Sequence, residues 1–390
     1  MQLFAGEQIV FSKYYIEFDK EIRRLFLEAK SPSKQRVTEI LEKSKGERLE
    51  LPEIAELLEI GANDQKEQFQ QLRCFTRERF RQGKNMLRHI SPVYLSNICI
   101  DTCSYCQFSA RRTDTQRTRL SLSDLEEELQ KGVLSLGSKV IEFTLATDSH
   151  FTPEILAKYI GRTKEILGDI KGRGILLCSD YLSTESYAML QDAGLWGVVQ
   201  WDETFDETVY RRWHRSSPRK SNMKKRMDNH DRALSQGLQV ATGVLLGLAD
   251  YRYDVLMNIA KSRYIESEYG IRPFVFGTPR LKSIHNKSIR SRTEIPDEQY
   301  ETVLMIYKIS EPEIGRWLQT RESFDLNIRN LLHNDVYTYK CGEVKPGGYY
   351  VNASVLNGRG SQFKVEEIEK PTFEKRLAEE GFELNYAWVK

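Results

Sequence analysis

Short apolar runs alternate with amphipathic helical segments along most of the chain, and this alternation restricts the possible folds more than any other feature. The runs are rich in β-branched and aromatic residues, which is typical of strands. They lie at residues 93–95, 140–145, 174–178, 197–201, 240–245, 273–276, 317–320 and 336–339. Eight strands that each lead into a helix predict a parallel sheet. We therefore expect an α/β fold with a (β/α)8 TIM-type barrel, and a doubly wound open sheet is the competing fold.

The helical segments carry start signals that support this pattern. Ser123 and Glu126 match a capping box ahead of an apolar helical face. Thr152 stands directly before Pro153, and proline is well suited to the first position of a helix. Ser183 precedes a third helical segment. Helices are therefore predicted to begin at these three places.

Residues 1–90 differ from the rest of the chain because they combine dense charge with helical periodicity and contain few strand candidates. The total length of 390 residues suits one large barrel with additions at its ends. We expect a helical N-terminal extension over residues 1–90, a barrel over residues 91–345, and a C-terminal segment over residues 346–390 that packs on the barrel.

The composition argues against several kinds of partner. Lys and Arg number 58 against 56 Asp and Glu, so no field of one sign covers the molecule and a nucleic-acid partner is not expected from net charge. The longest clearly apolar run, 244–249, is far shorter than the roughly 18 residues of a membrane span. Residues 1–13 include acidic Glu7 and lack the basic start of a signal peptide. A cytoplasmic location is therefore expected.

Three of the six cysteines, Cys99, Cys103 and Cys106, fall within eight residues just after the first expected strand. Thiolates are soft ligands that suit iron–sulfur clusters and zinc. A structural zinc ion needs four ligands, whereas the other cysteines are scattered singly, at positions 74, 178 and 341. The spacing therefore favours a four-iron cluster with one iron left open. A non-catalytic zinc- or cluster-binding module is an alternative.

This cysteine spacing after the first barrel strand resembles the radical S-adenosylmethionine (SAM) superfamily, in which the open iron binds SAM. Within it, the chain looks most like the aromatic amino acid lyases, and nearest to the 2-iminoacetate synthase type, the tyrosine lyase of thiamine biosynthesis. The matching motifs extend from about residue 92 to residue 381. They are 94–97 with the cysteines, 202–204 with Tyr210, 243–250, 279–281, 320–323 and 346–349.

The resemblance implies a reaction. Cys99, Cys103 and Cys106 would hold a [4Fe–4S] cluster that gives one electron to SAM, which yields methionine and a 5′-deoxyadenosyl radical. That radical takes a hydrogen atom from the substrate's amino group. The Cα–Cβ bond then breaks, so L-tyrosine would give dehydroglycine (2-iminoacetate) and a 4-hydroxybenzyl radical that ends as p-cresol.

The resemblance also implies roles for residues at the strand ends. Arg321 would bind the substrate carboxylate, because a guanidinium binds a carboxylate bidentately, with Tyr94 and Thr338 in the same pocket. Glu203 would accept hydrogen bonds from the SAM ribose. The expected SAM site comprises Tyr105, Asp148, Glu203, Gly243, Gly247 and Arg280.

Three departures from the family pattern stand out. One is that the Pro-Arg-Leu motif continues as Lys282-Ser283, where the family has Arg-Pro. The family usually has a Gly-Glu pair after the second strand, whereas this chain has Thr147-Asp148, where Asp148 has a shorter reach. The hydrogenase maturase carries further cysteines near its C-terminus, and this chain ends at Lys390 without them. Release of carbon monoxide and cyanide is therefore not expected.

Two other enzymes stay open as alternatives. A tryptophan lyase that makes an indolic acid shares the scaffold and the arginine anchor, and the sequence does not separate phenol from indole. A radical SAM enzyme that modifies RNA is the second alternative, because residues 211–226 contain many Lys and Arg side chains. For the lyase, the expected partners are a free amino acid, a one-electron donor such as flavodoxin or ferredoxin, and a thiazole synthase complex.

Overall fold

The computed structural model describes residues 10–83, 85–168, 174–281, 294–339, 342–353, 360–386 and 388. Within this part of the chain, ten strands form one sheet in which all neighbours are parallel. The order is β10-β1-β9-β8-β7-β6-β5-β4-β3-β2. The strands are β1 (Asn85–Arg88), β2 (Ser91–Ser96), β3 (Ile141–Leu145), β4 (Ile175–Cys178), β5 (Gly197–Val199), β6 (Gln239–Gly243), β7 (Val275–Gly277), β8 (Gly315–Leu318), β9 (Val336–Tyr337) and β10 (Phe382–Asn385).

The α/β TIM-type fold predicted from the sequence is confirmed, and each of the eight apolar runs overlaps one of the strands β2–β9. The sheet differs from the expected closed eight-stranded barrel in two ways. Strands β1 and β10 extend it beyond β9, and among the described residues no pairing joins β10 to β2, so the sheet is a curled half-barrel. Both added strands are four residues long and partly polar, which is why no apolar run marked them.

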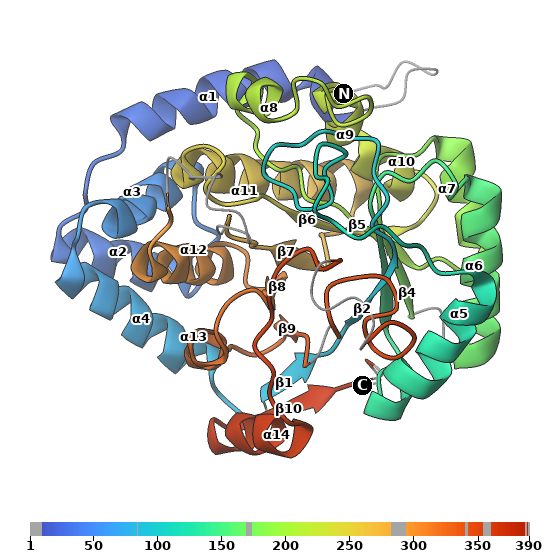
Figure 1. Cartoon of the computed structure of the whole chain (residues 1–390). Coiled ribbons are helices and arrows are strands. Elements are labelled where there is room, and N and C mark those ends of the chain that lie inside the picture. The colour runs from blue at the N-terminus through green and yellow to red at the C-terminus, as the bar shows by residue number, and fades with distance from the viewer. Residues whose placement is uncertain are drawn as a thin grey trace.

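Helices form an outer layer around the sheet (Figure 1). Those before the sheet are α1 (Tyr15–Glu28), α2 (Lys34–Ser44), α3 (Leu51–Ala62) and α4 (Lys66–Phe80). Those after β2 are α5 (Leu122–Glu127), α6 (Pro153–Leu167), α7 (Thr184–Ala193), α8 (Glu207–Trp213), α9 (Met223–Met227), α10 (Asn229–Leu234), α11 (Tyr251–Tyr269), α12 (Asp297–Ser310), α13 (Phe324–Asn330) and α14 (Lys370–Glu379). Short turns η1 (Phe11–Lys13), η2 (Glu128–Val133) and η3 (Leu134–Leu136) complete the described helical elements.

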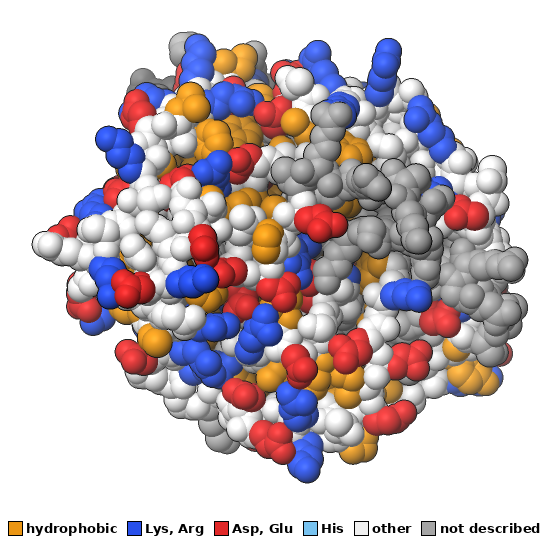
Figure 2. All heavy atoms as spheres, turned by 60° about the vertical axis from the view of Figure 1, so that its left-hand side comes forward, with side chains coloured by type: hydrophobic (Ala, Val, Ile, Leu, Met, Phe, Trp, Pro, Cys, Tyr) orange, Lys and Arg blue, Asp and Glu red, His pale blue; other side chains and the backbone are white. Residues whose placement is uncertain are grey.

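Helices α1, α3 and α4 pack on the outer surface of α11 and α12, and α2 packs on α4, so these four helices lie beyond the layer that covers the sheet (Figure 1). Basic and acidic side chains are interspersed over the face shown in Figure 2, in keeping with the net charge of +2. No helix in the described part of the chain is long and apolar enough to cross a membrane. The expected division at residues 90 and 345 stays a prediction. Strands β1 and β10 lie outside the predicted barrel range and still join its sheet.

Alternation along the strands separates two apolar layers. On β4, Leu177 belongs to the large core between sheet and helices, whereas Leu176 belongs to a smaller cluster inside the curled sheet. On β7, Phe276 and Val275 divide in the same way. Successive side chains of a strand point to opposite faces, so each strand contributes to both layers. The inner cluster fills part of the interior of the half-barrel and leaves the rest for a cavity.

Two of the predicted helix starts are confirmed and one is wrong. Thr152 accepts a hydrogen bond from the Ile155 N–H at the start of α6, and Ser183 caps α7 in the same way. Helix α5 starts two residues before the predicted box, because Ser121 and Asp124 form the reciprocal pair of side-chain to backbone hydrogen bonds. An acidic residue at the third helical position serves in a capping box even when it is Asp.

One buried carboxylate holds residues 349–351 against the helical layer. Glu128, 1% exposed in η2, accepts hydrogen bonds from the backbone N–H groups of Tyr349, Tyr350 and Val351 at 2.7, 2.9 and 2.9 Å. A carboxylate that accepts several N–H groups is held more strongly than a neutral acceptor. This contact places the segment after residue 345 beside the helical layer.

Replacing Glu128 with alanine tests this docking. Glu128→Ala leaves three backbone donors without their acceptor, so we expect a loss of roughly 3 kcal/mol in the free energy of unfolding. Urea denaturation measures the loss, and limited proteolysis should show faster cleavage near residues 349–351. Glu127→Ala is the matched control, because the Glu127 side chain is 56% exposed and pairs only with Lys131 on the surface. Equal stability of the two variants would contradict the assignment.

Candidate active site

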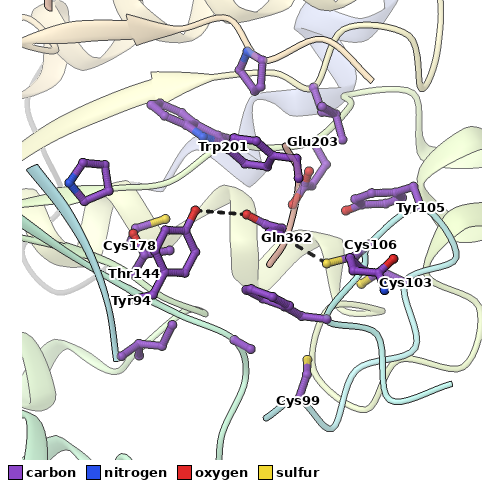
Figure 3. Close-up of a pocket in the computed structure, with 18 of the residues that line it drawn as sticks. Tyr94, Cys99, Cys103, Tyr105, Cys106, Thr144, Cys178, Trp201, Glu203 and Gln362 are labelled. Carbon is purple, nitrogen blue, oxygen red and sulfur yellow. Dashed lines mark hydrogen bonds between the residues drawn. The ribbon is translucent and has the colours of Figure 1, made fainter. Parts of the chain in front are cut away.

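A cavity of about 590 Å³ lies at the carboxyl ends of the strands (Figure 3). Residues that follow β2, β3, β4, β5, β6, β7, β8 and β9 line it, and residues 362–364 of the C-terminal segment cover one side. This end of a parallel barrel is where active sites are found, because the loops from all strands converge there. The cavity is therefore the candidate active site.

All three motif cysteines line this cavity, on the loop that follows β2. The Cys103 thiol is 4% exposed and lies 3.6 Å from the Ser217 hydroxyl. The Asp101 N–H donates to the Cys99 sulfur at 3.3 Å, and the Gln362 amide lies 3.9 Å from the Cys106 sulfur. Burial raises the pKa of Cys103 to about 12 and also raises the pKa of Cys99. The Cys99 and Cys103 thiols must therefore lose their protons when metal binds.

Two side chains that the sequence analysis did not single out hold the cysteine loop in shape. The Arg117 guanidinium donates to four backbone carbonyls of this loop, those of Asn97, Phe108, Ser109 and Arg112, at 2.6–3.1 Å. The Asp101 carboxylate accepts from the backbone N–H groups of residues 219 and 220 and from a threonine hydroxyl. These bonds satisfy polar groups that a buried loop cannot leave unpaired.

Tyr105 is held beside the cysteines by a chain of hydrogen bonds. Its hydroxyl lies 2.9 Å from His214 Nε2, and His214 Nδ1 lies 2.8 Å from the Tyr210 carbonyl oxygen. Burial lowers the pKa of His214 to about 4, so the ring is neutral near pH 7. A neutral ring that donates from Nδ1 accepts a hydrogen bond from the tyrosine hydroxyl at Nε2. His214 is thus a positioning residue for Tyr105.

Glu203 also reaches the cavity, at the turn after β5. Its carboxylate accepts a hydrogen bond from Lys220 at 2.5 Å and lies 3.8 Å from the Arg226 guanidinium. Burial alone would raise its pKa, but these two cations outweigh burial and hold the pKa of Glu203 at about 2. Its backbone adopts φ 66°, a left-handed conformation that is uncommon for a residue with a side chain. The site therefore contains one carboxylate that stays ionised.

The three predicted catalytic residues, Tyr94, Arg321 and Thr338, line the same cavity. The Tyr94 hydroxyl donates to Gln362 at 3.1 Å, and the Arg321 guanidinium lies 4.4 Å over the ring of Phe363. Burial lowers the pKa of Arg321. Thr338 donates to a backbone carbonyl and accepts from an indole N–H, so its hydroxyl is already used. Tyr94 and Arg321 are therefore better placed than Thr338 to contact a ligand.

Arg280 does not line the cavity, although it follows a strand as predicted. Its guanidinium forms ion pairs with Glu322 and with Asp297, the latter at 2.9 Å, and donates to the Ile295 carbonyl at 2.7 Å. It also lies 4.6 Å over the ring of Tyr300. These contacts attach α12 to the strand ends. Position in the chain did not reveal which way this side chain points.

Asp148, predicted to stand in for the family's glutamate, lines a neighbouring cavity instead. Its carboxylate accepts from Ser96 at 2.6 Å and from two nitrogens of Arg119 at 2.9 and 2.7 Å. These donors outweigh burial and lower its pKa. Ala146 and Thr147 take the cavity positions beside it. The acid is therefore committed to holding the loop after β3.

Gly243 and Gly247 are likewise not in the cavity wall. A Cβ on Gly243 would collide with the Gly277 carbonyl and with the Trp201 ring, so this glycine and Gly277 give the indole room to lie across β6 and β7. Gly247 has φ 103° in the turn after β6, which a glycine adopts without strain. Trp201, which these glycines admit, lines the cavity and was not among the predicted site residues.

The basic run 211–226 turns partly inward. Arg219 and Arg226 pair with Asp180 at 2.7 and 3.1 Å, and Lys220 pairs with Glu203 at the cavity wall. These three cations therefore hold the site together. Because they are consumed in this way, the run does not provide the unbroken exposed stripe on which the RNA alternative depended.

Two curated proteins with the same name are similar to this chain. The chain is 26% identical over 321 residues to 2-iminoacetate synthase of Salmonella typhimurium, covering 80% of each chain. It is 27% identical over 320 residues to the Escherichia coli enzyme, covering 81% of this chain and 80% of that one. No protein-family model matches the chain.

Solved structures show the same fold. HydG, a maturase of the [FeFe]-hydrogenase, superposes with a TM-score of 0.81 at 23% identity, over 96% of this chain and 81% of that chain. HydG from Carboxydothermus hydrogenoformans gives 0.82 at 25% identity, over 95% and 85%. Methylornithine synthase (PylB) gives 0.70 at 18% identity, over 89% and 97%.

The chain is thus similar to two 2-iminoacetate synthases over about four-fifths of its length. The resemblance drawn from its motifs is thereby confirmed. This similarity implies a [4Fe–4S] cluster and SAM as cofactors. The same cavity is lined by all the residues that would hold these cofactors, namely Cys99, Cys103, Cys106 and Glu203.

The thiols that line the cavity fit an iron–sulfur cluster. Within the described residues, no group of three His, Cys, Asp or Glu side chains is close enough to share one metal ion. Cysteines that each bind a different iron of a cluster stand farther apart than ligands of a single ion. Cys74 is exposed on α4, Cys178 lies in the cavity across from the three cysteines (Figure 3), and Cys341 is outside the described residues. Among the described cysteines, the three of the motif therefore remain as the candidate ligands.

Removing one motif cysteine should abolish the cluster. We expect Cys99→Ala, Cys103→Ala and Cys106→Ala, each reconstituted without oxygen, to lose most bound iron and acid-labile sulfide. Cys74→Ala is the matched control, because that thiol is exposed and distant from the cavity. Iron and sulfide analysis measures the result. Full iron content in the motif variants would show that other residues bind the metal.

Proposed function

We propose that this chain is a lyase that cleaves the Cα–Cβ bond of free L-tyrosine to p-cresol and dehydroglycine. The observation that carries the proposal is the sharing of one cavity by the cysteine motif, Glu203 and Arg321. The similarity to the two 2-iminoacetate synthases supports it, because it extends over about four-fifths of each chain.

Each side chain has a task that follows from its surroundings. Arg321 binds the substrate carboxylate, because its guanidinium is buried in the cavity and its face is steadied by Phe363. Glu203 stays ionised and accepts hydrogen bonds from the two ribose hydroxyls of SAM. Tyr94 forms part of the wall between them, and its hydroxyl is fixed by Gln362.

The cofactors, when bound, supply a radical that removes a hydrogen atom from the substrate. The chain supplies position and exclusion of water, because a reactive radical must meet the substrate before it meets solvent. Residues 362–364 cover the cavity, and the Gln362 amide contacts both Tyr94 and Cys106, on opposite sides of it (Figure 3). The C-terminal segment thereby encloses the space where substrate and SAM would meet.

Two partners belong to this proposal. Two electrons per turnover must come from outside, one to cleave SAM and one, together with a proton, to reduce the 4-hydroxybenzyl radical to p-cresol. A small electron carrier such as flavodoxin or ferredoxin is therefore required. Dehydroglycine is an imine that water hydrolyses, so a thiazole synthase complex that takes it up directly is the proposed acceptor.

The reaction is tested with reconstituted protein under anaerobic conditions. With SAM, a one-electron reductant and L-tyrosine, we expect p-cresol and 5′-deoxyadenosine to form together. Product analysis by liquid chromatography and mass spectrometry follows both. Omission of SAM is the control. Indolic products from L-tryptophan without p-cresol from L-tyrosine would contradict the proposal.

The carboxylate anchor is tested by Arg321→Gln. Loss of a charge-assisted, bidentate contact should lower kcat/KM for tyrosine by roughly 100-fold, mainly through a higher KM. Arg329→Gln is the matched control, because Arg329 is 41% exposed and pairs with Glu301 on α12. Steady-state p-cresol formation measures both variants. An unchanged KM in Arg321→Gln would move the carboxylate site elsewhere.

A further inference from the structure

A buried acid lies inside the half-barrel, on the cavity wall away from the cysteines. Glu142 is on β3, is 5% exposed and lines the cavity. Its neighbours Ile141 and Phe143 belong to the outer core, so Glu142 and Thr144 point inward. Thr144 is in register with Cys178 of β4, and Figure 3 shows both beside Tyr94, opposite the three cysteines.

No cation balances this acid. Thr144 and Cys178, both neutral, are its hydrogen-bonding neighbours, and no basic side chain in the described part of the chain forms an ion pair with it. Burial raises the pKa of Glu142 to about 8, so at neutral pH the carboxyl keeps its proton. A protonated carboxyl has one O–H donor and an acceptor oxygen.

The apolar surroundings of Glu142 raise the free-energy cost of burying its carboxyl group. Pro92, Trp201 and Trp317 line the cavity with it, and the inner apolar cluster lies close by. The Thr144 hydroxyl is buried and makes no hydrogen bond of normal geometry with any described residue. Buried polar atoms without partners cost free energy. An unpartnered hydroxyl beside a buried, uncharged acid in an aromatic pocket therefore indicates that a ligand completes the hydrogen bonds there.

Depth in the half-barrel indicates which part of a ligand reaches Glu142. Glu142 is in register with Pro92, four residues before the end of β2, and the cysteine loop follows that end. Four residues of strand span roughly 13 Å. A substrate held by its carboxylate and amino groups near the strand ends must therefore direct its side chain toward this acid.

We propose that Glu142 recognises the phenol hydroxyl of the substrate and so determines specificity for tyrosine. The inference rests on the proposed tyrosine lyase function and names the residue that selects the ring. The carboxyl donates to the phenol oxygen or accepts from the phenol O–H, and Trp201 packs against the ring. Phenylalanine leaves the acid unpaired, so the pocket rejects it. Glu142 contacts the ring end, where no bond breaks, and is a specificity residue.

The test compares two substitutions with tyrosine as substrate and phenylalanine as competitor. Glu142→Leu removes the hydrogen bond, and we expect the KM for tyrosine to rise about 10- to 100-fold while phenylalanine becomes a tighter inhibitor. Glu142→Gln retains a donor and an acceptor and should keep the preference for tyrosine within a few-fold. Thermal unfolding and iron content, measured on each protein, confirm that the variants fold and carry the cluster.

The outcomes separate this inference from the function on which it rests. Wild-type protein that forms no p-cresol would overturn the proposed function. Wild-type protein that forms p-cresol, together with a Glu142→Leu variant that discriminates tyrosine from phenylalanine as well as wild type, would overturn the inference alone. A Glu142→Gln variant that loses discrimination as fully as Glu142→Leu would also overturn it, since the amide keeps the hydrogen-bonding capacity.

Discussion

The loop that carries the three cysteines is held by hydrogen bonds to its own backbone, and the rest of the site depends on this constraint. Arg117 binds four carbonyls from inside the loop, and Asp101 ties the loop to the backbone at residues 219 and 220. The same stretch supplies Lys220, which holds Glu203 ionised at the cavity wall. The metal ligands and the proposed ribose acceptor are therefore positioned by one connected network.

The cavity inside the half-barrel has two distinct regions. At the strand ends lie the cysteines, Glu203 and Arg321, which are suited to polar and charged groups. Deeper inside lie aromatic walls and one uncharged acid, Glu142, suited to a ring with a single polar edge. Gly243 on β6 and Gly277 on β7 leave space for the Trp201 ring, which lines the cavity. These small residues in the sheet therefore help to set the shape of the cavity.

The sequence predicted the parts of the structure that have strong local signals. Eight strands appear as apolar runs, and the cysteine spacing is specific in itself. Strands β1 and β10 were missed because their residues are partly polar and gain stability only by pairing with each other and with β9. The capping box of α5 was predicted two residues too late in the chain, because serine and acidic residues occur with the same spacing at both places.

Only part of the site was predicted, because the sequence gives position along the chain and not the direction of a side chain. Strand-end position brought Tyr94, Glu203 and Arg321 into one cavity, but it did not give side-chain direction, so Arg280 and Asp148 were included although both are occupied in ion pairs outside it. Arg117 and Glu142 were missed because their importance comes from burial and from partners distant in the sequence.

The central claim is that three cysteines leave one iron of a [4Fe–4S] cluster open for SAM. Electron paramagnetic resonance of the reduced, reconstituted protein tests it most directly. Addition of SAM should change the spectrum of the reduced cluster, because a new ligand reaches the open iron. A spectrum that stays the same at saturating SAM, or a protein that binds zinc and no sulfide, would contradict the account.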